Sequence, residues 1–401
     1  MITSLALIIL IGLLLSKLCS IFKVPSLIGL IATGAILGPY ILNYLSPDIL
    51  QISPDLRLIA LVLILLKAGL SLSFDNLKKI GKYAFFLSFV PASCEIVGYS
   101  IFGPLLLGLK FDEALLLGSI IAAVSPAVVV PRMVKLMDNE IGTKKGIPQM
   151  LLGGASCDDI FVIVMFSVFL HVNQTSQIDL LQFSLLPVTV LSSVLLGVVV
   201  GYMLHLLFEY SYKIGHYIRN SEKIMIILGV SFALIGVERL LHNTFSISGL
   251  LAMMTMAIAL NVKTTSSVIE RLKAKFSKLW LFAEILLFVL LGACINLEAT
   301  VNIGLGAIAI IFIALIFRSF GVFLSLLTSN LNAQERLFCI ISYIPKATVQ
   351  AAIGGIPLAL GLPCGNVLLS VAVLSIIITA PLGAFLSDLT YKKLLLPSSS
   401  K

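Results

Sequence analysis

The stretch SIIAAVSPAVVVPRM, from Ser119 to Met133, decides the fold. It belongs to an apolar run, residues 112–133, that is long enough to cross a bilayer as a helix. Pro126 cannot donate a hydrogen bond to the carbonyl of Ala122, and its ring crowds the preceding turn. We expect the helix to break here and to free the carbonyls around Ala122, Ala123 and Val124, together with the hydroxyl of Ser125. A simple proline kink is the alternative.

A second apolar run carries a similar interruption. It reads SYIPKATVQAAIGGIPLALG from Ser342 to Gly361, with Pro345 and Lys346 near its middle. A further break is expected at the glycines and proline of residues 354–357. Interrupted helices in corresponding halves of a membrane protein indicate a transporter's binding site.

The composition sets the class of protein. Hydrophobic residues make up 59% of the chain, charged residues only 11%, and the mean hydropathy is +1.12. Soluble domains carry about a quarter charged residues, so we predict an all-α, polytopic membrane protein. We predict about thirteen membrane spans. They are residues 2–22, 25–42, 56–72, 81–108, 112–133, 147–171, 180–208, 223–241, 244–262, 279–296, 301–328, 335–361 and 364–388.

The basic residues predict the orientation. Lys and Arg accumulate in cytoplasmic loops, and with thirteen spans nearly all basic residues in the connections and at the span ends fall on the side of the C-terminus. The exceptions are Arg57, Lys110 and Arg239. We therefore expect a plasma or inner membrane protein with its N-terminus outside and residues 389–401 as a cytoplasmic tail. The net charge of +8 lies in short alternating loops, which disfavours nucleic acid as a partner.

Four of the predicted spans carry charges at depth. They are Glu95, the pair Asp158 and Asp159, Arg318, and Lys346. A charge at the bilayer centre costs at least about 2.5–3.5 kcal/mol, so each is a candidate functional residue. The alternative is a set of buried ion pairs that only orients the helices.

The aspartate pair lies in GGASCDDIFVIVMF, from Gly153 to Phe166. Adjacent side chains on a helix point about 100° apart, so one carboxylate can hold an ion while the other is paired. The small residues before the pair, including Ala155 and Ser156, let water or a dehydrated ion approach. A close-packing seam is the alternative.

Spans four to six correspond to spans eleven to thirteen as two copies of one repeat. The copies are seven spans apart, and because seven is odd, corresponding spans cross the membrane in opposite directions. Glu95 and Arg318 then occupy equivalent positions with opposite charges. We expect Arg318 to pair with Glu95 or Asp158, because a guanidinium has five fixed donors and does not release a proton. Lys346 is expected to neutralise the partial negative charge of half-helix ends. A buried carboxylate can hold a proton or a cation, and exchange requires only that the two compete.

Three motifs together resemble the monovalent cation/proton antiporter superfamily. They are AVSPAVVVP (Ala123 to Pro131), GASCDDI (Gly154 to Ile160) and YIPKATVQAAIG (Tyr343 to Gly354). The similarity is to the branch with an aspartate pair, which includes bacterial sodium/proton antiporters and the animal sodium/hydrogen exchanger 9B-like proteins.

The resemblance implies an inverted-repeat fold with two crossing broken helices. It implies a moving core (residues 81–171 and 301–388), a scaffold that dimerises (1–72 and 223–296) and a linker helix (180–208). In that family the second aspartate binds the ion, so Asp159 takes this role, and Asp158 is the paired one. Oxygen atoms at Ala123, Val124, Ser125, Ala155 and Ser156 are expected to complete the site.

The predicted function is elevator-type exchange of Na⁺, or Li⁺, for H⁺, without a cofactor. Potassium/proton exchange is the alternative within the superfamily. A channel lacks support because no repeated filter is visible, and an organic-anion symporter usually needs a wider polar or basic pocket. No nucleophile motif or phosphate loop supports an enzyme. Arg318 stands where several bacterial relatives have a titrating lysine, so the proton stoichiometry stays open.

Overall fold

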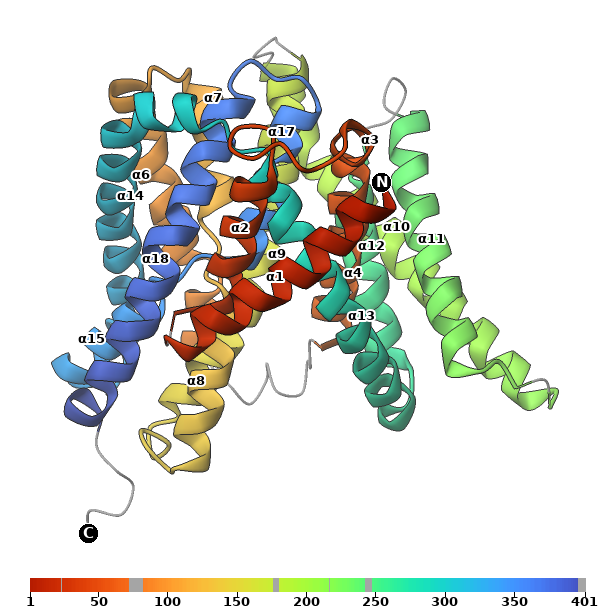
Figure 1. The fold of residues 1–401 in the computed structure, drawn as a ribbon. Helices are drawn as coiled ribbons and strands as arrows, with labels where there is room; N and C mark the ends of the chain where they lie inside the picture. The colour runs from red at the N-terminus through yellow and green to blue at the C-terminus, as the bar shows by residue number, and fades with distance from the viewer. Residues whose placement is uncertain (23, 72–81, 176–179, 216, 242–246, 396–401) are drawn as a thin grey trace. The chain divides into compact units, whose positions relative to one another are not determined.

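The computed structural model describes residues 1–22, 24–71, 82–175, 180–215, 217–241 and 247–395. Within these ranges every element of regular secondary structure is a helix, and no strand is present (Figure 1). The N-terminal half holds α1 (Ile2–Ile21), α2 (Ser26–Leu37), α3 (Pro47–Gln51), α4 (Ser53–Ser71), α6 (Val90–Leu107), α7 (Phe111–Ile121), α8 (Pro126–Asp138), α9 (Ile147–Thr175) and α10 (Leu180–Lys213). The C-terminal half holds α11 (Asn220–Leu241), α12 (Gly249–Lys263), α13 (Ser266–Ala293), α14 (Leu297–Ser325), α15 (Ala333–Ser342), α16 (Thr348–Ile353), α17 (Ile356–Ala359) and α18 (Gly365–Leu394).

Many of these helices match a bilayer in length and composition. Among the described residues, 8 helices are long and apolar enough to cross a membrane. Three more apolar helices are shorter, at Ser26–Leu37, Gly249–Lys263 and Thr348–Ala359. Each predicted span overlaps a helix or an interrupted pair of helices, but the count of thirteen crossings stays a prediction.

The chain divides into two compact units. The first comprises Met1–Arg57, Asp75–Asn173 and Ile285–Lys401, and the second comprises Leu58–Phe74 and Gln174–Glu284. In the second unit α12 packs against α10 and α11. All the candidate site residues lie in the first unit. The predicted division into a moving core and a scaffold remains a prediction.

In the first unit, α6 and α14 lie side by side (Figure 1). Gly321 of α14 allows this approach, because a Cβ added there would lie 2.7 Å from the Cα of Pro91 on α6. No side chain fits at that distance. The close packing places Glu95, on α6, beside Arg318, on α14.

Two helical segments are interrupted in the first unit. Residues 122–125 separate α7 from α8, and residues 343–347 separate α15 from α16. Pro126 is the first residue of α8, a position where a proline costs the helix no hydrogen bond. The two interruptions meet, since the amide of Ser125 donates to the carbonyl of Pro345 at 2.8 Å.

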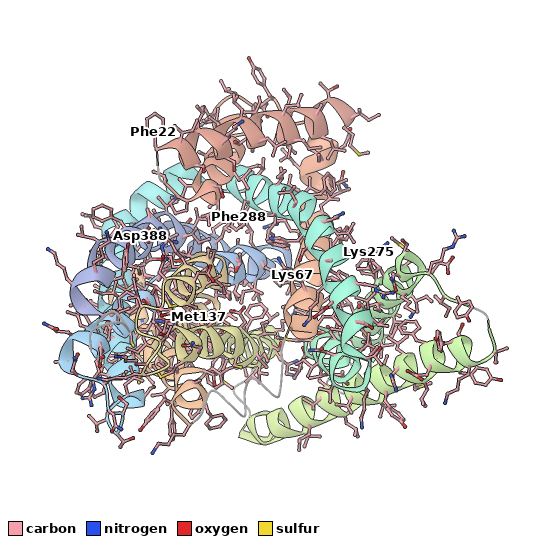
Figure 2. The ribbon with its side chains drawn as sticks, turned by 90° about the horizontal axis from the view of Figure 1, so that it is seen from below. Phe22, Lys67, Met137, Lys275, Phe288 and Asp388 are labelled. Carbon is pink, nitrogen blue, oxygen red and sulfur yellow. The ribbon has the colours of Figure 1, made fainter. Side chains whose placement is uncertain are left out.

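Ion pairs also join helices away from these interruptions. Arg132 of α8 binds Asp388 of α18 through two nitrogens, Nε to Oδ1 at 3.1 Å and Nη2 to Oδ2 at 2.9 Å. Figure 2 labels Asp388, whose side chain is 57% exposed. Lys145, in the loop before α9, binds Glu335 of α15 at 2.7 Å.

Candidate functional site

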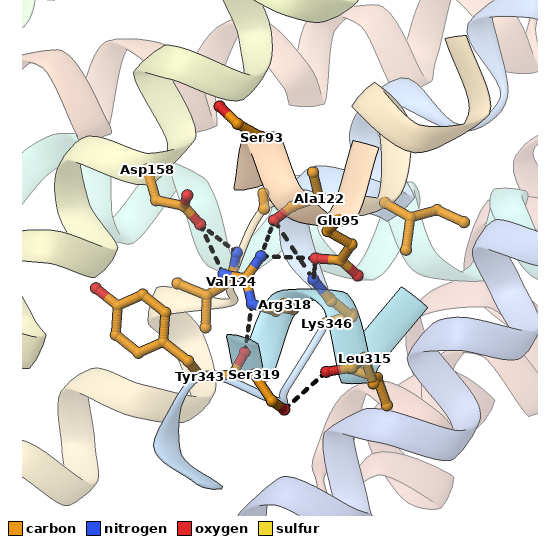
Figure 3. A network of polar contacts seen from close by, with 12 residues as sticks. Ser93, Glu95, Ala122, Val124, Asp158, Leu315, Arg318, Ser319, Tyr343 and Lys346 are labelled. Carbon is orange, nitrogen blue, oxygen red and sulfur yellow. Dashed lines mark hydrogen bonds and ion pairs between the residues drawn. The ribbon is translucent and has the colours of Figure 1, made fainter. Parts of the chain in front are cut away.

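Arg318 is the centre of a buried polar network (Figure 3). Its Nη1 donates to Glu95 Oε2 at 2.7 Å and to the carbonyl of Ala122. Its Nη2 donates to Asp158 Oδ2 at 3.1 Å, and its Nε donates to the carbonyl of Tyr343 at 2.7 Å. One guanidinium therefore binds α6, α9 and both interruptions, which a single ammonium group could not do.

Lys346 is the second cation of the network. Its Nζ lies 2.6 Å from Glu95 Oε2 and 3.4 Å from the carbonyl oxygen of Ala122. Its own amide donates to the Thr379 hydroxyl of α18 at 2.9 Å. Ala122 caps the C-terminal end of α7, so Lys346 stands where the helix dipole favours a positive charge.

Asp158 is fully buried and uses one of its two oxygens. Its Oδ2 accepts from the amide of Val124 at 2.6 Å and from Arg318 at 3.1 Å. Its Oδ1 has no hydrogen-bond partner among the described residues. The structure therefore brings together Glu95, Asp158, Arg318 and Lys346, two negative and two positive charges.

Asp159 follows directly on α9 and differs from its neighbour. The residue is 8% exposed, and its Oδ1 has no hydrogen-bond partner in the described part of the chain. No ion pair within 4.0 Å joins it to a described basic residue, so its charge adds to a set that is already balanced. A buried carboxylate in that setting needs a proton or a cation.

The interruption between α7 and α8 offers fewer open oxygen atoms than its sequence suggests. The carbonyl of Ala122 accepts from Arg318 and Lys346, and the carbonyl of Ala123 accepts from Gln350 Nε2 at 2.8 Å. No described donor binds the carbonyl of Val124, and the buried Ser125 hydroxyl also lacks a described partner. A carbonyl has two lone pairs, so Ala123 keeps some capacity, but Val124 and Ser125 are the better candidate ligands.

The two small residues before the aspartate pair lie inside the continuous helix α9. Ala155 is fully buried in the apolar cluster around Val124 and Tyr343. Its carbonyl is directed along the helix toward the amide four residues on. The side chain of Ser156 lies outside the described part of the structure, so both stay predicted ligands only.

Three polar contributors were not singled out from the sequence. They are the carbonyl of Tyr343, the hydroxyl of Thr379 and the amide side chain of Gln350. Gln350 could have been found, because an amide in an otherwise apolar span needs buried partners. The other two carry no comparable signal in the sequence.

Chemically, the site offers hard oxygen donors beside one uncompensated carboxylate. Hard oxygen donors suit alkali and alkaline-earth cations rather than soft metals. A single surplus negative charge is balanced by one monovalent cation or by one proton.

Comparison with known proteins identifies the family of this chain. Residues 5–388 match the family model described as sodium/hydrogen exchanger, transmembrane. The chain is similar to human sodium/hydrogen exchanger 9B2, with 32% identity over 405 residues that cover 95% of this chain and 72% of that protein. It is also similar to human sodium/hydrogen exchanger 9B1, with 30% identity over 357 residues, 86% of this chain and 67% of that one.

A solved structure shows the same fold. The sodium proton antiporter MjNhaP1 from Methanocaldococcus jannaschii at pH 8 superposes with a TM-score of 0.81, covering 98% of each chain at 23% identity. At this identity the likeness concerns the fold alone. The resemblance inferred from the three motifs is confirmed by the family match, and the chain belongs to the sodium/hydrogen exchanger family.

Proposed function

We propose that this membrane protein exchanges Na⁺, or Li⁺, for H⁺, with Asp159 as the group that both ions share. The observation that carries the proposal is the charge balance around it. Glu95 and Asp158 are matched by Arg318 and Lys346, whereas Asp159 has no basic residue within ion-pair distance among the described residues. A proton or a sodium ion neutralises Asp159, and the two cannot do so together.

The Val124 carbonyl and the Ser125 hydroxyl are the neutral ligands that we assign to the sodium ion. Both belong to the interruption whose Val124 amide is held by Asp158. Asp158 thereby connects the aspartate pair to the broken helix. Its unpartnered Oδ1 makes it a second candidate contact for the cation.

We propose a stoichiometry of one proton for each cation. Arg318 does not release a proton at physiological pH, and its four acceptors favour the charged form. We propose that Lys346 keeps its proton as well, because its Nζ lies 2.6 Å from Glu95. With both cations retained, Asp159 alone gains and loses the proton, and each cycle moves no net charge.

Alternating access by an elevator motion, and a homodimeric scaffold in the cell membrane, complete the proposal by analogy with the family. Potassium exchange uses the same oxygen chemistry, so the transported cation has to be measured directly.

The test uses purified protein in sealed vesicles that contain a pH-sensitive dye. Na⁺, Li⁺ or K⁺ is added in turn. The Na⁺ and Li⁺ experiments are repeated with the membrane voltage clamped by valinomycin and potassium. We expect Na⁺ and Li⁺ to drive proton movement at rates that do not depend on voltage. The substitution Asp159→Asn should reduce the signal to that of protein-free vesicles.

The matched control is Asp388→Asn, which removes an exposed aspartate from the same unit. It should keep near-normal exchange. Normal exchange by folded Asp159→Asn would show that Asp159 is not the shared ion-binding group. A voltage-dependent rate would show that a second group carries protons. A response to K⁺ alone would establish the potassium exchanger.

A further inference from the structure

Gln350 is a fully buried amide that joins the two interrupted segments. It lies in the first turn of α16, and its side chain is 0% exposed. Its Nε2 donates to the carbonyl of Ile121 at 2.9 Å and to that of Ala123 at 2.8 Å. Its Oε1 accepts from the amide of Ala347 at 2.8 Å. The side chain thus satisfies backbone groups at the end of α7 and at the start of α16.

These contacts fix the peptide unit between Ala123 and Val124. Its carbonyl is bound by Gln350, and its N–H donates to Asp158 Oδ2 at 2.6 Å. A trans peptide is planar, and its C=O and N–H point in opposite directions. Holding both ends leaves this unit no freedom to rotate.

The next peptide unit is fixed as a consequence. The amide of Ser125 donates to the carbonyl of Pro345 at 2.8 Å. The Val124 carbonyl belongs to the same planar unit, so it points away from Pro345 and carries no hydrogen bond from a described donor. Its direction depends on the unit before it, which Gln350 and Asp158 hold.

We propose that Gln350 is a positioning residue for the transported cation, an inference that rests on the proposed function. Gln350 binds the Ala123 carbonyl and thereby aims the Val124 carbonyl and the Ser125 hydroxyl at the cation beside Asp159. It does not touch the cation and does not exchange a proton. Losing such an outer contact typically weakens metal binding by about 10–100-fold.

A purely structural role makes a different prediction. If Gln350 only stabilised the fold, its loss would lower the amount of active protein and therefore the maximal rate, equally for every cation. A positioning role instead raises the KM for the cation while the folded protein keeps its maximal rate. It also changes the ratio of the KM values for Na⁺ and Li⁺, because cations of different size depend differently on ligand placement.

The experiment compares Gln350→Met with the wild type in dye-loaded vesicles, with protein amounts matched after size-exclusion chromatography. Methionine keeps the length and neutrality of the side chain and removes all three hydrogen bonds. Gln350→Asn is the second variant, which keeps the amide but is one methylene too short to bind both carbonyls. Ser375→Ala is the control, since Ser375 is equally buried on α18 and its hydroxyl bonds, among the described residues, only to Ala372 of its own helix.

We expect both Gln350 variants to raise the KM for Na⁺ about tenfold or more, with the maximal rate within about twofold of wild type. The ratio of the KM values for Na⁺ and Li⁺ should also change. Ser375→Ala should match the wild type. If either folded variant keeps the wild-type KM for Na⁺ and the wild-type ratio of the KM values for Na⁺ and Li⁺, the positioning role is overturned, whether or not the maximal rate falls. Asp159→Asn is measured alongside. If this variant still exchanges Na⁺, the proposed site fails. If it is inactive while Gln350→Asn keeps the wild-type KM values, only the role of Gln350 is refuted.

Discussion

At the scale of single residues, the site depends on charge balance more than on any one contact. Glu95 accepts from both Arg318 and Lys346, at 2.7 and 2.6 Å, and is 1% exposed. Removing one member of a buried ion pair leaves an uncompensated charge, which costs far more than removing both.

This balance makes a prediction for Glu95. While Asp159 is protonated, Glu95→Gln leaves two cations against Asp158 and should lower the free energy of unfolding by about 3–5 kcal/mol. Adding Lys346→Met removes the surplus charge, so the double variant should be more stable than Glu95→Gln alone. The midpoint of thermal unfolding in detergent gives the comparison. Additive losses from the two changes would show that the two residues are not coupled.

Residue types in the sequence predicted much of this site, and side-chain geometry decided the rest. A charge in an apolar span is costly, so Glu95, Asp158, Arg318 and Lys346 could be singled out by residue type and position alone. The sequence could not show that Asp158 binds the Val124 amide rather than leaving it free. Nor could it show that Gln350 occupies the Ala123 carbonyl, because such bonds depend on how distant segments meet.

At the scale of helices, proline marks the interruptions and glycine lets a neighbour pack against one of them. Pro126 and Pro345 predicted interruptions in two segments. The helices before them end at Ile121 and Ser342, and the helices after the interruptions begin at Pro126 and Thr348. The contribution of Gly383 was not predictable, since it depends on where α18 crosses. A Cβ added to Gly383 would lie 2.5 Å from the Cγ of Pro345.

Gly383→Ala should therefore displace α18 or the segment at Pro345. We expect a loss of stability of about 1–3 kcal/mol from overpacking and slower exchange, because Lys346 follows Pro345 directly. Gly304→Ala on α14 is the matched control, as a Cβ there meets no described atom within 4 Å beyond its own stretch of helix. The control should be as stable as the wild type or slightly more so. Equal behaviour of the two variants in thermal unfolding and exchange would show that the packing against Pro345 is unimportant.

At the scale of the whole molecule, the proposed competition between a proton and a cation for Asp159 predicts how exchange responds to pH. Low pH favours the protonated acid at Asp159, so more Na⁺ is needed to displace the proton, and high pH favours the carboxylate that binds Na⁺. The KM for Na⁺ should rise by up to about tenfold per unit of pH on the acidic side and level off on the alkaline side.

Initial rates at several Na⁺ concentrations, measured at matched pH on both sides of the membrane, test this dependence. A lower maximal rate at acidic pH with a constant KM would instead indicate that protons act away from the cation site.

The depth of the polar network also determines how it responds to ionic strength. Salt at 0.1 M screens charges in water over about 10 Å, but it screens buried pairs much less. The Arg132–Asp388 pair, whose side chains are 27% and 57% exposed, will weaken as a sodium titration raises the salt concentration. The pairs around Arg318, whose side chains are at most 2% exposed, will not. Raising NaCl should therefore fill the proposed cation site while the ion pairs around Arg318 stay intact, so a sodium titration would report occupancy of that site rather than screening.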